Sequence, residues 1–143
     1  MNVHDKRECS VTDVMDEVRR SEYSWMLHIL GRYNIPVRFS RSLASNAVGA
    51  YSFKRERTAD GGPARVKDRA IELNPDRPYF FLIAGTLIHE LQHAIDLNGE
   101  YEGAKESDRP ELERRAERTQ GEYLRRRCFR PLARLGAARA YAA

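Results

Sequence analysis

Residues 87–95 read L-I-H-E-L-Q-H-A-I and contain the pattern H-E-x-x-H, formed by His89, Glu90 and His93. On an α-helix the two histidines lie one turn apart on the same face, because residues four positions apart are neighbours there. Two imidazoles placed in this way can supply two corners of a tetrahedral zinc site. Glu90 beside them can act as a general base toward a water molecule, so the pattern predicts metal-assisted hydrolysis.

The residues around this pattern predict that its helix is buried. The intervening and flanking positions are uncharged and mostly apolar, and neither proline nor glycine occurs from residue 86 to residue 98. Buried polar groups cost free energy unless they have partners. Two histidines and a glutamate on a buried helix therefore need a compensating partner, and a bound metal ion is the simplest one.

A third protein ligand is needed, because a catalytic zinc site keeps one corner for water. No histidine follows His93 in the sequence, and His4 and His28 are remote from it. His28 is interpreted as a packing or surface residue, and Asp96 as a capping or solvent-facing residue. The remaining candidates are carboxylates of the next predicted helix, which are Glu111, Glu113 and Glu117.

Glu113 and Glu117 lie one helical turn apart, and the small residue Ala116 lies close to both. H-E-x-x-H followed by E-x-x-[small]-[acidic] about twenty residues later resembles the gluzincin branch of the zinc metallopeptidases. The resemblance implies that Glu113 is the third zinc ligand, that Ala116 allows close helix packing, and that Glu117 orients a histidine from behind the ligands. Glu117 is the alternative ligand, since one turn of helix slip would exchange the two roles.

The elements that must position these residues are predicted from hydrophobic spacing. Residues 10 to about 31 fit one amphipathic helix that Ser10 or Thr12 can cap. Strands are expected at 37–40, 47–55 and 67–73, and the turn signal at 58–63 makes the last two a hairpin.

Two helices are predicted after the strands. The helix that carries H-E-x-x-H is expected to have Pro78 in its first turn. It is expected to run to about Leu97, before the stop signal Asn98-Gly99. Pro110 then opens the second helix, which ends near Arg127.

These elements predict an α+β fold in one domain spanning residues 1–143, with a core at about 10–127 and a basic helical tail at 128–143. The domain comprises an N-terminal helix, a small, mostly antiparallel three-stranded sheet, the H-E-x-x-H helix and a ligand-bearing helix, an order that resembles the zincin fold. The order is similar to the minimal domains of ImmA/IrrE-like and, less well, SprT-like proteins. The resemblance implies one Zn²⁺ per chain and an edge strand at 69–73 that pairs with an extended protein or peptide substrate.

Composition leaves further partners open. The net charge is +4, arginine outnumbers lysine 21 to 4, and Arg125, Arg126 and Arg127 begin a basic stretch. This stretch predicts either a solvated helix face or a nucleic-acid patch, and the solvated face is preferred. A zinc-stabilised module without catalysis is the other alternative function.

The remaining residues bear on location and mechanism. No apolar run is long enough to span a membrane, and Cys9 and Cys128 are expected to be free thiols, so a cytoplasmic protein is predicted. Hydrolysis also calls for a donor that stabilises the oxyanion. The candidates are Tyr51, Tyr101 and Tyr123, and the sequence does not choose among them.

Overall fold

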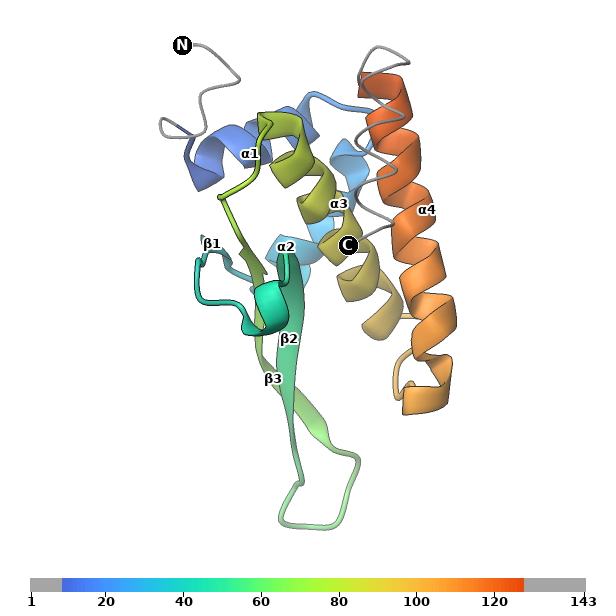
Figure 1. The fold of residues 1–143 in the computed structure, drawn as a ribbon. Helices are drawn as coiled ribbons and strands as arrows, with labels where there is room; N and C mark the ends of the chain where they lie inside the picture. The colour runs from blue at the N-terminus through green and yellow to red at the C-terminus, as the bar shows by residue number, and fades with distance from the viewer. Residues whose placement is uncertain (1–8, 128–143) are drawn as a thin grey trace.

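The computed structural model describes residues 9–127, so His4, Cys128 and the predicted tail at 128–143 lie outside the described residues. The protein is α+β, as predicted, with N-terminal helices, a small sheet and two long packed helices (Figure 1). The elements in chain order are α1 (Val11–Arg19), η2 (Ser24–Leu27), α2 (His28–Tyr33), β1 (Val37–Phe39), η3 (Ala44–Asn46), β2 (Gly49–Glu56), β3 (Arg65–Leu73), α3 (Phe80–Leu97), η4 (Glu106–Asp108) and α4 (Arg109–Arg127).

The prediction of one long N-terminal helix is wrong. Helix α1 begins at the predicted cap, Ser10, but it ends at Arg19. The Ser21 hydroxyl donates to the Val18 carbonyl at 2.7 Å and accepts from the Tyr23 amide at 3.1 Å. A serine side chain that bonds the backbone in this way competes with helical hydrogen bonds. The chain therefore turns and continues as the short helices η2 and α2.

The sheet is mixed, with strand order β1-β3-β2. The longer ladder, between β2 and β3, is the predicted antiparallel hairpin, whereas β1 pairs in parallel with the end of β3, where Val37 lies opposite Ile71. The prediction that residues 69–73 form an edge strand is therefore wrong. Sequence order did not reveal that β1 would take the second side of β3, which leaves β2 at the edge.

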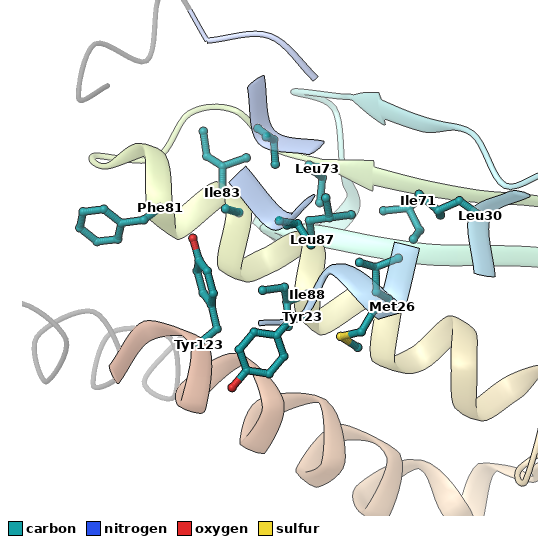
Figure 2. Close-up of a cluster of buried hydrophobic side chains, with 14 of the residues drawn as sticks. Tyr23, Met26, Leu30, Ile71, Leu73, Phe81, Ile83, Leu87, Ile88 and Tyr123 are labelled. Carbon is teal, nitrogen blue, oxygen red and sulfur yellow. The ribbon is translucent and has the colours of Figure 1, made fainter. Parts of the chain in front are cut away.

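Helix α3 forms the centre of the core. It begins at Phe80 rather than at Pro78, and most of its residues are buried between the sheet, α1 and α4. Figure 2 shows side chains from β3, α3 and the N-terminal helices meeting in one apolar cluster, with Tyr123 of α4 beside it. Its fully buried members include Met26, Ile71, Leu73, Ile83, Leu87 and Ile88. An apolar environment on nearly every side of α3 is what an uncharged, largely apolar helix requires.

Helices α3 and α4 lie side by side and run in opposite directions (Figure 1). Ala116, predicted to allow close approach, has no exposed surface. The C-terminus of α3 is tied to the sheet by Asn98, whose amide group donates to the Tyr51 hydroxyl at 2.8 Å and accepts from Arg69 at 2.9 Å. The sheet and both helices are therefore joined around the H-E-x-x-H segment.

Candidate metal centre

His89, His93 and Glu113 converge in the structure. Nε2 of His89 lies 3.3 Å from one carboxylate oxygen of Glu113, and Nε2 of His93 lies 3.0 Å from the other. One ligand atom from each residue lies within 4.8 Å of the other two, so the group could hold a metal ion. The two imidazole rings meet edge to face, with centroids 4.9 Å apart. This is the two-histidine, one-carboxylate donor set that suits zinc.

A buried polar network sets the register of α4 against α3. Arg115 of α4 donates two hydrogen bonds of 3.0 Å to Asp96 of α3, and the hydroxyl of Thr119 donates to Gln92 at 3.0 Å. Asp96 is 2 % exposed, so the expectation of a capping or solvent-facing role for it is wrong. A bidentate ion pair is directional, and it places Glu113, two residues before Arg115, opposite the histidines.

Gln120 is the site residue that sequence reasoning missed. Its side-chain oxygen lies 2.9 Å from Nδ1 of His89 and is buried. Because that oxygen only accepts, Nδ1 is the donor, which leaves Nε2 directed to the site. Gln120 lies seven residues after Glu113, two turns along the same helix face, but this spacing does not single out a neutral amide in the sequence. Glu117, predicted for this role or as the alternative ligand, lines the same cleft, and both assignments stay predictions.

The charges of the three residues depend on one another. Hydrogen bonds from His89 and His93 hold the pKa of the Glu113 carboxyl far below its ordinary value. Burial lowers the pKa of His89, but its hydrogen bond to Glu113, the charge of Glu90 and the bond to Gln120 outweigh burial, so the pKa of His89 is raised. The Glu113 carboxyl is therefore ionised at neutral pH, as a carboxylate that binds a metal must be.

Glu90 is held between α3 and the edge strand β2. Its side chain is almost fully buried, and burial raises its pKa above the ordinary value, while the neighbouring histidines lower it. The backbone of Tyr51 donates a hydrogen bond to the carboxylate. A Cβ atom on Gly49 would come within 3.3 Å of the Glu90 carboxylate and 2.5 Å of the Thr86 methyl group. Glycine at position 49 is therefore what allows β2 to approach this side chain.

The group opens into a cleft of about 620 Å³ between β2, α3 and α4. Residues 46–51 form one wall, and the side chains of Glu90 and Glu113 face the same space. The Glu113 side chain is 44 % exposed, whereas both histidines are nearly covered, so the group is open to solvent from the Glu113 side.

Of the three candidate tyrosines, Tyr51 alone lines this cleft. Tyr101 stacks under the Arg115 guanidinium, and Tyr123 is buried edge to face against Tyr23 (Figure 2). His28 bonds the Trp25 carbonyl, in agreement with its interpretation as a packing or surface residue.

Two described arginines of the predicted basic stretch form ion pairs within the fold. Arg126 forms an ion pair with Glu22, and Arg127 with Glu17, which is almost fully buried on α1. These contacts join the end of α4 to the N-terminal part of the fold, which favours a structural role for both arginines. Cys9 is a half-buried free thiol, and burial raises its pKa to about 11, so it is a poor metal ligand at neutral pH.

Fold and site together define an α+β protein with a His-His-Glu group that could hold a metal ion. No protein-family model, curated protein or solved structure matches the chain. Within residues 9–127, no helix is both long enough and apolar enough to cross a membrane.

Proposed function

We propose that this protein is a zinc-dependent metallopeptidase of the gluzincin type that binds one Zn²⁺ through His89, His93 and Glu113. The observation that carries the proposal is the convergence of these three side chains beside the buried Glu90 in a cleft open to solvent. The donor set fits zinc, because two neutral imidazoles and one carboxylate with an open side are typical of catalytic rather than structural zinc sites.

The positions of the side chains support a hydrolytic reaction. A zinc ion held there would supply a Lewis acid that polarises a carbonyl and lowers the pKa of water. Glu90 accepts the proton of the attacking water and passes it to the leaving amine. The burial that raises its pKa suits this exchange, since a carboxyl with a higher pKa both takes and returns a proton readily near neutral pH. Gln120 keeps His89 oriented throughout.

The edge strand β2 supplies a surface for an extended protein or peptide substrate. It pairs with β3 on one side, and within the described residues no strand occupies its other side. Residues 49–51 of β2 line the cleft directly beside Glu90. Strand addition at this edge would place a peptide bond of the substrate along the cleft. Tyr51 is accordingly the tyrosine proposed to face the oxyanion.

The first experiment measures zinc content by elemental analysis in the wild type, Glu113→Ala and Glu117→Ala. We expect about one zinc per chain in the wild type, a loss of zinc in Glu113→Ala, and a weaker effect in Glu117→Ala. The reverse order of the two variants would make Glu117 the ligand. A wild type without zinc after zinc is added back would refute the proposal.

Catalysis is tested separately with Glu90→Gln, which keeps the shape of the side chain and removes its basicity. We expect this variant to bind zinc as the wild type does and to lose peptide hydrolysis by about 100-fold or more. Full zinc occupancy in the wild type with no hydrolysis of any peptide in a mixed library would instead favour the zinc-stabilised module without catalysis.

Nucleic acid stays an alternative partner, with less support than a peptide. Arg126 and Arg127 already pair with acidic residues of the fold, which favours a structural role for them. A cytoplasmic location also stays a prediction from the sequence.

A further inference from the structure

We propose that Arg77 is a receptor for a carboxylate of the substrate, so that the cleft takes peptides bearing an acidic side chain or a free C-terminus near the scissile bond. This inference rests on the proposed peptidase function and names a class of substrate for the same cleft. It is carried by the position of Arg77, its half-burial and the lack of a carboxylate partner for it among the described residues.

Arg77 enters the cleft from the segment that joins β3 to α3. It lines the cleft together with His89, Glu90 and His93, and it is half-buried. The preceding residue, Asp76, forms its ion pair with Arg41 at 3.3 Å. Across residues 9–127, no carboxylate forms a hydrogen bond or ion pair with the Arg77 guanidinium.

Two carboxylates of the cleft, Glu90 on α3 and Glu113 on α4, are engaged with other groups. Glu113 is held between two histidines, and Glu90 accepts from the backbone of Tyr51. Burial alone shifts the pKa of Arg77, and it lowers it, as expected for a cation removed from water without a compensating anion. A guanidinium nevertheless stays charged at neutral pH. A carboxylate that binds it through two parallel hydrogen bonds would offset its desolvation.

The second arginine of the cleft, Arg109, is different. Its side chain is 71 % exposed and pairs with Glu106 at 3.2 Å. Its cation is therefore hydrated and already neutralised in part, so it has less to gain from a substrate anion. The contrast selects Arg77.

Arg77 also lies at a definite end of the proposed substrate strand. Asn74, three residues earlier, donates its backbone amide to the Val48 carbonyl at 2.9 Å, immediately before β2 begins. Arg77 therefore lies close in the chain to the contact at the start of β2. The hydrogen bond between Asn98 and Tyr51 lies farther along β2, at the C-terminal end of α3. In a peptide bound along β2, only the substrate residues at one end of the cleft would reach Arg77. This predicts selectivity for an acidic group on one side of the scissile bond.

The test compares zinc-loaded wild type, Arg77→Gln, Arg77→Lys and the control Arg109→Gln, which removes the exposed arginine of the cleft that pairs with Glu106. Each is assayed on matched peptides that carry Glu or Gln at successive positions, with the C-terminus free or amidated. We expect the wild type to prefer the acidic member by about tenfold or more in kcat/KM at one position, as a charge-assisted hydrogen bond implies. Arg77→Gln should abolish the preference, Arg77→Lys should retain part of it, and Arg109→Gln should leave it unchanged.

Amidation separates the two sources of the carboxylate. A preference lost on amidation assigns Arg77 to the C-terminus, and a preference that follows Glu over Gln assigns it to a side chain. Hydrolysis without discrimination, or discrimination that survives in Arg77→Gln, would overturn the inference and leave the peptidase intact.

A binding measurement keeps the two proposals distinguishable. Fluorescence anisotropy with labelled Glu and Gln peptides is measured on zinc-loaded Glu90→Gln, with and without Arg77→Gln. The wild type could show no hydrolysis of any peptide, while the acidic peptide still binds more tightly than its Gln counterpart in an Arg77-dependent manner. In that case the peptidase proposal fails and the carboxylate receptor stands. Equal binding of both peptides would overturn the receptor.

Discussion

His89 is constrained at both nitrogens of its ring. Nδ1 is bonded to Gln120 at 2.9 Å, and Nε2 faces Glu113 at 3.3 Å. The ring can therefore present one nitrogen lone pair to a metal without the cost of first restricting its rotation. Helix geometry predicted that His89 and His93 share one face of a helix, and the resemblance to gluzincins pointed to Glu113 on the next helix; the structure brings these three side chains together. Sequence reasoning assigned no role to the glutamine, because a neutral amide carries no recognisable motif.

At the residue scale, we predict that Gln120→Met weakens zinc binding by about 10- to 100-fold, as is usual for residues that orient a metal-bound histidine. Methionine has a similar length but offers no strong acceptor to Nδ1. Zinc affinity is measured by competition with a chromogenic chelator. Glu117→Gln is the matched control on the same helix and in the same cleft, and an effect larger than that of Gln120→Met would give the orienting role to Glu117.

The elements meet at the site through one close contact between strand β2 and helix α3. Gly49 lies against Thr86 and Glu90, and its Cα faces them without a side chain. The sequence predicted a strand here and a buried helix afterwards. It wrongly predicted that residues 69–73 form the edge strand, because the true order depends on β1 pairing with the other side of β3.

At the element scale, we predict that Gly49→Ala lowers the free energy of unfolding by about 1–3 kcal/mol, the usual range for overpacking. The new methyl group would overlap the Thr86 methyl group and press on Glu90, so peptide hydrolysis should fall as well. Chemical denaturation and kcat/KM measure the two effects.

Two variants control this experiment. Thr86→Ser removes the overlapping methyl group and keeps the hydroxyl that donates to Leu82, so it should restore most of the stability of Gly49→Ala. Gly31→Ala, in α2, has open space around the new atom and should stabilise by about 0.5–1 kcal/mol. No rescue by Thr86→Ser would contradict the assigned contact.

In the whole molecule, the group of His89, His93 and Glu113 joins the two long helices near the middle of α3. The network of Asp96, Arg115, Gln92 and Thr119 joins these helices through hydrogen bonds that involve none of the three candidate ligands. We therefore expect zinc to add stability to a fold that other contacts also hold together, in contrast to small zinc fingers, which depend on the metal to fold.

We accordingly predict that the metal-free protein unfolds cooperatively and that zinc raises its Tm by several degrees. Free zinc at 100 times the Kd stabilises the folded state by about 2.7 kcal/mol. Differential scanning calorimetry with a chelator and then with added zinc measures the shift. Glu113→Ala should show little shift, and an equal shift in that variant would place the bound zinc elsewhere.

The sequence by itself determined the class of the fold, both long helices and the shared helix face of the two histidines. Helical periodicity places His89 and His93 on one face, and the interval to Glu113 suits two antiparallel helices joined by a loop. Only the tertiary structure decided the partners that depend on contacts between distant segments. Asp96 is buried because Arg115 reaches it from another helix, Gln120 meets His89 across the same interface, and Arg77 enters the cleft from a connecting segment. Such contacts depend on register and packing between elements, and local spacing in a sequence does not specify them.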